Sequence, residues 1–235
     1  MKKMFAPALA ALMLLASLSV APPRAQAQGP GLVSSILNKM DRNRRSLASL
    51  RANIYMEKYN AQLRDTDKYS GDMAYIAAKG RDANVRVDWA KPAQEFLAVS
   101  GGQYTLYRPR LNQAYQGSAK NAKGKGAAGN VLSMAFNMSG AQARNQFNVE
   151  LVGEGELYKG SPHVWWLKFT PRGGNQGFQF AEVWVADDGM PIQSRVTEKN
   201  GDATTVRLTN IQRNARVSPS DINIELPAGT KIVKG

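Results

Sequence analysis

The residue type most often used for acid–base or metal chemistry occurs once in this chain. His163 is the only histidine of 235 residues, and it stands directly before Val164-Trp165-Trp166. A lone histidine cannot form a His-rich metal site, and a Ser–His–Asp triad would need partners that lie elsewhere in the sequence. We therefore expect His163 at the edge of a strand, and we keep a hydrolase that uses it as an alternative.

Paired carboxylates are the next candidates for chemistry. Asp187 and Asp188 have the residue type that glycosidases use as acid and base. They directly precede Gly189, however, and an Asp-Asp-Gly sequence between two apolar runs is typical of a hairpin turn. Glu154 and Glu156 stand in a glycine-punctuated hairpin. We interpret all four carboxylates as structural.

Residues 124–129 match the pattern G-x-G-x-x-G. The dinucleotide fingerprint requires a buried strand immediately before this pattern, within a βαβ unit. Here the preceding segment is small, polar and basic, with Lys120 and Lys123. Residues 118–129 are therefore predicted to be a mobile loop, and no cofactor is expected. Polyanion binding by its lysines is an alternative, and it would depend steeply on salt.

The composition excludes several classes of site. The chain has no cysteine, which rules out disulfides, Cys-type zinc sites, Cys nucleophiles and lipid attachment to a cysteine. Its formal net charge is +13. In a cytoplasmic protein, such a charge would suggest binding to nucleic acid. For an exported one we expect no nucleic acid, and the available polyanions are lipid headgroups, acidic proteins and cell-surface polymers. A charge that serves solubility alone is the other interpretation.

The N-terminus indicates export. Lys2 and Lys3 precede an apolar run over residues 5–20, and Ala25-Gln26-Ala27 offers small residues at a cleavage site. These features are typical of a secretory signal peptide, and the apolar run is shorter than the ~20 residues of a membrane span. We predict a signal peptide over 1–27 and a single domain over 28–235. An N-terminal membrane anchor is the alternative.

The rest of the chain is predicted to form one helix followed by a mainly antiparallel meander. Apolar residues at three- to four-residue spacing predict a helix over 32–49. Period-two alternation bounded by turn residues predicts about a dozen strands, at 50–56, 69–78, 84–89, 95–99, 103–107, 113–116, 147–152, 156–158, 164–170, 178–186, 191–198, 204–212, 223–226 and 231–233. Two short helices, over 131–138 and 140–144, are expected to interrupt the meander.

Apolar residues of the early strands suggest a binding function. Val85, Val87 and Trp89 share one face of a predicted strand, and Leu97, Val99 and Leu106 follow on its neighbours. Each taken singly is typical of ordinary core. The apolar, Met-containing insertion over 131–138 favours another interpretation, because a sheet that closes on itself under a movable helix can admit an apolar guest.

Three stretches of the chain together resemble a known family. Residues 80–92 and 96–109 run from Arg81 through a strand to Pro92, then an apolar strand, a turn and a strand ending in Tyr107-Arg108-Pro109. Residues 130–151 are similar to a helical lid and the strand after it. Residues 178–233 contain a strand, an Asp-Gly turn, a second strand and another turn, and Leu226-Pro227-Ala228-Gly229 follows near the end. In this order they resemble the periplasmic outer-membrane lipoprotein carrier (LolA) family.

The resemblance implies an open antiparallel β-barrel of about 11 strands, wrapped over an N-terminal helix and a short helical lid. It also implies a non-enzymatic, monomeric periplasmic carrier that takes lipoproteins from an inner-membrane ABC-type complex to an outer-membrane acceptor. Arg81 matches the family's lid latch, although Asp82 follows it where the family has proline. A sensor of the same fold is the alternative function. The residues expected to line an acyl-chain cavity are Val85, Val87, Trp89, Leu97, Val99 and Leu106, with Leu132, Met134, Phe136 and Met138 on the lid.

Overall fold

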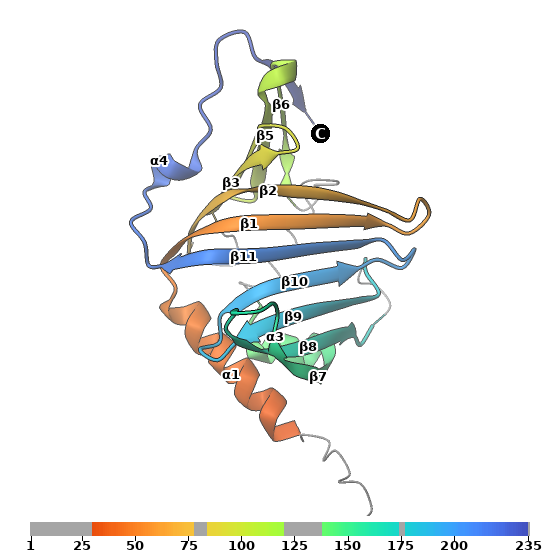
Figure 1. Ribbon diagram of the computed structural model, residues 1–235. Helices are drawn as coiled ribbons and strands as arrows, with labels where there is room; N and C mark the ends of the chain where they lie inside the picture. The colour runs from red at the N-terminus through yellow and green to blue at the C-terminus, as the bar shows by residue number, and fades with distance from the viewer. Residues whose placement is uncertain (1–29, 78–83, 120–137, 174–176, 235) are drawn as a thin grey trace, which may run out of the picture.

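One strongly twisted sheet makes up most of the described part of the protein (Figure 1). The structure is a computed structural model, and it describes residues 30–77, 84–119, 138–173 and 177–234. The predicted signal peptide over 1–27 and the glycine-rich residues 124–129 lie outside the described residues. None of the helices in the described part of the chain is long and apolar enough to span a membrane.

In the described part of the chain the sheet has twelve strands, and three short or medium α-helices accompany them. The helices are α1 Pro30–Ser46, α3 Gly140–Gln146 and α4 Pro219–Ile222, and a 3-10 turn covers Pro109–Leu111. The strands are β1 Ser49–Asn60, β2 Asp65–Ile76, β3 Asn84–Lys91, β4 Glu95–Ser100, β5 Gln103–Arg108, β6 Gln113–Ser118, β7 Phe147–Glu156, β8 His163–Pro171, β9 Phe180–Ala186, β10 Pro191–Thr197, β11 Ala203–Arg213 and β12 Lys231–Lys234.

The strand order shows how the two halves of the chain meet. It runs β12-β6-β5-β4-β3-β2-β1-β11-β10-β9-β8-β7, so β1 joins the early meander to the late one. All neighbouring strands are antiparallel except β12, which pairs in parallel with β6. Because β7 and β12 are the two edges, the sheet is open. The prediction of an open, mainly antiparallel sheet is confirmed, with twelve strands rather than about eleven.

Alternation along β1 explains why one face of the sheet is buried. Leu50, Ile54 and Met56 are fully buried, whereas Tyr55 is exposed. Successive side chains of a strand point to opposite faces, so the apolar residues of β1 all lie on one side. Ile54 faces Leu208 of β11 in the register. We call the face that carries these buried residues the inner face.

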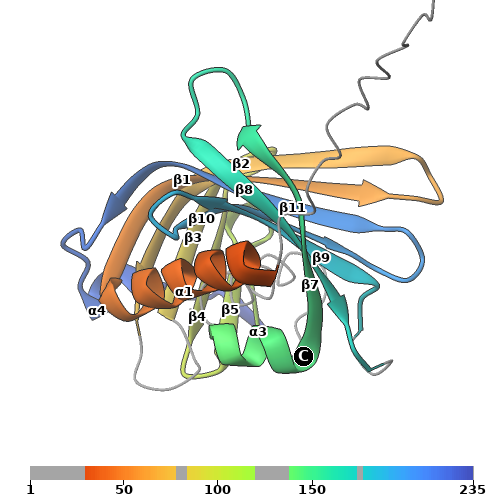
Figure 2. The same cartoon turned by 90° about the horizontal axis from the view of Figure 1, so that it is seen from below.

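The N-terminal helix covers one half of this face. Ile36 and Leu37 of α1 are 0% and 2% exposed and pack with Leu167, Phe169 and Val183 of β8 and β9. Figure 2 shows α1 crossing the underside of the sheet, with α3 beside it. Apolar residues three to four positions apart form one helical stripe, which is the pattern that predicted this helix. We call the buried residues of this region the α1 cluster.

Two local predictions differ from the structure. The strands expected at 147–152 and 156–158 are one strand, β7, whose register against β8 shifts between Leu151 and Gly153. The strand expected at 223–226 is not formed. That segment belongs to a connection that crosses the outer face. The helix predicted at 140–144 is confirmed as α3, which begins with a capping box between Ser139 and Gln142.

Candidate functional site

The six strand residues expected to line a cavity lie together on the inner face. Val85 is directly opposite Val99, and Val87 is opposite Leu97. Leu97 is in turn opposite Leu106 on β5. Directly paired residues of an antiparallel sheet project from the same face and contact one another. The sequence pattern therefore placed these side chains on the correct side of their strands.

These pairs belong to three rows that cross the sheet perpendicular to the strands. The first row, here the Val85 row, consists of Leu50, Tyr75, Val85, Val99 and Tyr104. The Val87 row consists of Ala52, Met73, Val87, Leu97, Leu106 and Tyr115. The Trp89 row consists of Leu208, Ile54, Gly71, Trp89 and Glu95. Apolar and aromatic side chains thus form a continuous surface from β11 to β6.

Burial of the rows is nearly complete. Val87 and Trp89 are each 1% exposed and Leu97 is 2% exposed, while Val99 is half-buried. All six strand candidates belong to or pack against one apolar cluster, which also includes Met56. We call it the inner cluster. Burying one Leu or Val side chain contributes about 1.5–3 kcal/mol, so these residues stabilise the fold as well as shaping its interior.

The residues expected on the lid are only partly described. Met138 packs against the α1 cluster. The other three lid candidates, Leu132, Met134 and Phe136, lie outside the described residues. The same is true of Arg81, the expected latch. Their roles therefore stay predictions.

Polar groups lie beside the apolar residues in the Trp89 row. Glu95, opposite Trp89, is 8% exposed, and its Oε1 lies 3.5 Å from Nε of Arg108. The Arg108 guanidinium also lies over the ring of Tyr115, 5.1 Å from its centroid. A buried carboxylate needs such a partner, because desolvating an unpaired charge is costly. The inner face is therefore apolar at Val85 and Val87 and mixed at Trp89.

Trp89 is the most unusual residue at this boundary. Its ring meets that of Tyr69 edge-on, with centroids 5.8 Å apart. Burial, followed by the nearby charge of Asp67, raises the pKa of Tyr69 above its ordinary value. The indole Nε1 of Trp89 is buried and has no hydrogen-bond partner among the residues that the structure describes. Leaving a buried donor unpaired costs about 1–3 kcal/mol, and buried tryptophans usually avoid it.

Comparison with known proteins identifies the family of this fold. The sequence profile described as "Outer membrane lipoprotein carrier protein LolA" matches residues 46–224, which is more than half of the chain. The chain belongs to the LolA family. It is 25% identical over 191 residues to an outer-membrane lipoprotein carrier protein of Methylobacillus flagellatus, covering 80% of this chain and 84% of the relative. It is 24% identical over 150 residues to one of Bordetella avium, covering 62% of this chain and 63% of the relative.

Solved structures share the fold of this LolA-family chain. An uncharacterized conserved protein from Thermus thermophilus matches 87% of the chain with a TM-score of 0.53 and 15% identity, over 99% of its own length. MucB matches 84% of the chain with a TM-score of 0.55 and 14% identity, over 64% of its own length. At such identities the similarity shows the fold alone.

The structure brings the histidine singled out in the sequence of this LolA-family chain next to two of the carboxylates. His163 Nδ1 lies 3.0 Å from Asp187 Oδ1, and its Nε2 lies 3.9 Å from Glu154 Oε2. Asp188 accepts a hydrogen bond from the Met190 backbone and pairs with Arg213. Among the described residues, no group of three His, Asp or Glu is placed to hold a metal. The prediction that Asp187 and Asp188 lie in a turn is confirmed.

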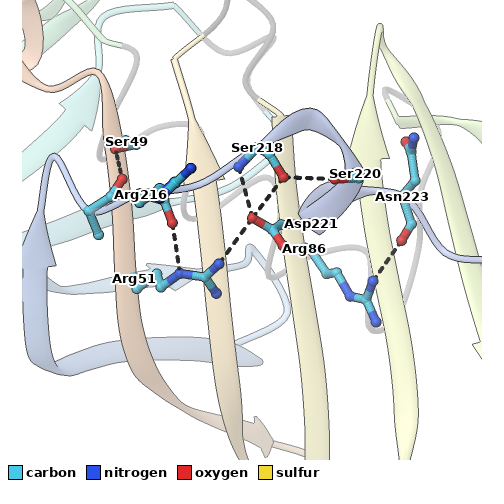
Figure 3. Close-up of polar contacts among 9 residues, drawn as sticks. Ser49, Arg51, Arg86, Arg216, Ser218, Ser220, Asp221 and Asn223 are labelled. Atoms are coloured by element: carbon cyan, nitrogen blue, oxygen red, sulfur yellow. Dashed lines mark hydrogen bonds and ion pairs between the residues drawn. The ribbon is translucent and has the colours of Figure 1, made fainter.

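A polar strap on the outer face was missed by the sequence analysis. Residues 214–230, here called the strap, link β11 to β12 and cross the outer face of β1 to β4 (Figure 3). Arg51 reaches the strap from β1: its Nη2 lies 3.1 Å from Asp221 Oδ2, and its Nε donates to the Arg216 carbonyl at 3.4 Å. The backbone N–H and hydroxyl of Ser218 also bond to the Asp221 carboxylate, and these bonds lower its pKa.

The second attachment of the strap comes from β3. Arg86 Nη1 donates to the Asn223 carbonyl at 2.6 Å (Figure 3). Arg86 Nε also pairs with Asp88 of the same strand at 2.7 Å. Ile222, between the two arginine contacts, is 2% exposed. Arg51 and Arg86 alternate with inner-face residues along their strands. This alternation was the one feature of the sequence that indicated that both cations lie on the outer face. Their partners lie more than 130 positions away, and alternation says nothing about them.

Proposed function

We propose that this protein is a non-enzymatic, monomeric periplasmic carrier that binds the acyl chains of lipoproteins against the inner face of its sheet. It takes them from an inner-membrane ABC-type complex and delivers them to an outer-membrane acceptor. Membership of the LolA family supports a carrier role in general. The predicted signal peptide supports export.

The observation that carries the proposal is the continuity of the three inner rows. Five neighbouring strands, β1 to β5, place Leu50, Val87 or another apolar or aromatic side chain at nearly every inner position. Hiding an acyl chain from water is worth about 0.8 kcal/mol per CH₂, or about 12 kcal/mol for sixteen carbons. A surface of this kind offers comparable burial, which a carrier needs to keep its cargo out of water.

A carrier must also release its cargo, and we assign that step to the expected lid. Leu132, Met134 and Phe136 would cover the bound chains, and Arg81 would hold the lid closed. A small free-energy difference between closed and open lid sets how readily cargo leaves. If Arg81 is the latch, Arg81→Leu loads cargo normally and hands it over more slowly, and unchanged transfer kinetics would remove Arg81 from the mechanism.

Lipid analysis and transfer assays test the proposal. We expect mass spectrometry of the purified mature protein to find acylated molecules, and we expect the protein to move an acylated probe between two vesicle populations. Leu106→Asn, on the inner face and 8% exposed, is expected to abolish binding. The matched control is Leu63→Asn at a hairpin tip, where the side chain is 73% exposed. Equal binding by two folded variants would contradict the proposal.

A lipid-sensing role is the second candidate. MucB, which shares the fold, has been solved in complex with MucA from Pseudomonas aeruginosa, and that structure matches 82% of this chain with a TM-score of 0.50 and 15% identity, over 61% of its own length. The fold is therefore compatible with a regulatory binding module as well as with a carrier. A sensor binds the acylated molecule without delivering it. The vesicle assay separates the two functions, since only a carrier transfers the probe to the second population.

A further inference from the structure

The indole N–H of Trp89 is a buried donor at the point where the inner face changes from apolar to polar. The side chain is 1% exposed, and Nε1 has no hydrogen-bond partner in the described part of the chain. Buried tryptophans usually pair this donor, because its hydration is lost on folding. An unpaired donor that persists in an apolar interior is a natural position for an acceptor supplied by a ligand.

The residues around Trp89 define the acceptor that would fit. Stepping along β3 from Val87 to Trp89, the partner on β4 changes from Leu97 to Glu95. The corresponding residue of β5 changes from Leu106 to Arg108, which pairs with Glu95 at 3.5 Å. A molecule lying along the strands would therefore meet apolar side chains first, and then a donor beside a charge-balanced pair. This order matches an acyl chain that ends in a polar group.

Charge selects among the possible polar groups. Glu95 is buried on the same face as Trp89 and is directly opposite it. A ligand carboxylate at Trp89 would bring a second anion beside Glu95 in a region of low dielectric constant, which is unfavourable. A plain alkane would leave the N–H unpaired. A neutral carbonyl meets both conditions, because it accepts a hydrogen bond and carries no charge.

We propose that Trp89 Nε1 donates a hydrogen bond to the ester or amide carbonyl of an acyl chain that lies along β3, across the Val85 and Val87 rows. This inference rests on the proposed function and adds a determinant of specificity to it. The apolar rows bind the chain, and Trp89 distinguishes an acylated molecule from a free fatty acid or a hydrocarbon. It also fixes how far along the sheet the chain is inserted, because the carbonyl must reach the indole.

Four probes of equal chain length test the proposal on the mature protein: methyl palmitate, N-methylpalmitamide, palmitate and hexadecane. Trp89→Phe keeps the aromatic ring and removes the N–H. We expect this variant to bind methyl palmitate and N-methylpalmitamide about fivefold to tenfold more weakly than wild type does, as for the loss of one hydrogen bond. Its affinity for hexadecane is expected to stay within about twofold of the wild-type affinity. The two carbonyl probes show whether an ester or an amide is preferred, and wild-type protein is expected to bind palmitate more weakly than either.

Trp166→Phe is the matched control. Trp166 Nε1 is also buried, and it too has no hydrogen-bond partner among the described residues. Trp166 directly precedes Leu167 in β8, so its side chain projects from the other face of the strand than Leu167 and the α1 cluster, and it stacks on Trp184 at 5.3 Å. We expect this variant to bind all four probes as wild type does. A loss in Trp166→Phe equal to that in Trp89→Phe would show that the effect is general destabilisation, and the assignment to Trp89 would be wrong.

An NMR measurement on wild-type protein gives a readout that needs no variant to bind ligand. The indole proton of ¹⁵N-labelled Trp89, assigned by its absence from Trp89→Phe, is expected to move downfield with methyl palmitate and not with hexadecane. The same shift with both probes, or none with either, overturns the hydrogen bond while leaving acyl binding intact. Wild-type protein that binds none of the four probes overturns the proposed function, and this inference with it.

Discussion

Gly189 lies so close to α1 that a Cβ atom at this position would be 2.3 Å from the Lys39 carbonyl oxygen. Its φ angle of +87° is also one that residues with a side chain rarely adopt. The turn between β9 and β10 therefore touches the helix backbone directly. Nearby, Asn43 Nδ2 of α1 donates to Met190 Sδ at 3.5 Å. These contacts fix α1 to the sheet independently of its apolar stripe.

The close approach predicts a large effect of Gly189→Ala. The left-handed conformation costs about 1–2 kcal/mol for alanine, and the clash with α1 adds about 1–3 kcal/mol. The control is Gly229→Ala, where φ is +78° but no atom of the described residues lies within 4 Å of the added Cβ. We expect urea unfolding to show a loss of about 3 kcal/mol or more for Gly189→Ala and about half of that for Gly229→Ala. Equal losses would show that α1 moves aside freely.

The apolar stripe of α1 gives a second prediction. Leu37 is 2% exposed within the α1 cluster, so Leu37→Ala is expected to lower the free energy of unfolding by about 2–5 kcal/mol. Leu32→Ala, at a half-buried position of the same helix, is expected to cost about 1 kcal/mol or less. The comparison tests whether α1 is a fixed part of the core. A helix that swings open with cargo would show small losses at both positions.

The capping box of α3 gives a third prediction. Ser139 Oγ accepts a hydrogen bond from the Gln142 backbone N–H at 3.1 Å, and the Gln142 side chain accepts one from the Ser139 backbone at 2.9 Å. Ser139→Ala is expected to cost about 1 kcal/mol in thermal or urea unfolding. Gln142→Ala, which keeps the serine cap, is expected to cost less. A larger loss for Gln142→Ala would contradict this assignment.

The strap gives a pH-dependent prediction through Asp221. Its bonds to Ser218, together with the charge of Arg51, hold the pKa of this carboxyl below the ordinary value near 3.8. Because the folded-state pKa is lower than the unfolded one, the stabilisation is complete above pH ~4 and is lost as the pH falls towards the folded-state pKa. Asp221→Asn is therefore expected to be less stable than wild type at pH 6, and the difference is expected to shrink below pH 4.

The control for this series is Glu225→Gln, an exposed carboxylate of the same strap. We expect its stability to follow that of wild type over the whole pH range. Urea unfolding at several pH values between 2.5 and 6 measures both variants. A constant difference between Asp221→Asn and wild type across that range would show that the variant acts through packing, without a contribution from ionisation.

Local patterns predicted the strands well and their partners only in part. Period-two alternation found β1 and β3 and put Val87 and Trp89 on the inner face, because a half-buried strand requires that pattern. It gave no information on the pairing of β1 with β11, where Ile54 meets Leu208, since that contact depends on the whole topology. The binary apolar pattern also hid Glu95, an inward-facing charge whose partner Arg108 lies on the next strand.

The strap shows a different limit of sequence reasoning. Alternating residues after Asn223 favoured a strand at 223–226, yet this segment pairs with none of the strands in the described sheet. The Asn223 carbonyl is bonded by the Arg86 side chain instead, and Ile222 is buried. Side chains thus supply the hydrogen bonds that a strand would have received from backbone. Such long-range side-chain pairing leaves no periodic signal.

The pairing of β1 with β11 has a consequence for how the protein is made. Residue 54 pairs with residue 208 at the centre of the sheet. The first strand to leave the ribosome or an export channel therefore cannot complete its pairing until nearly the last strand has emerged. Until then, its apolar edge has no permanent neighbour and is open to aggregation. Assembly should accordingly be slow and should finish only after synthesis ends. A newly made chain would then gain from being shielded by a chaperone until its final segment arrives.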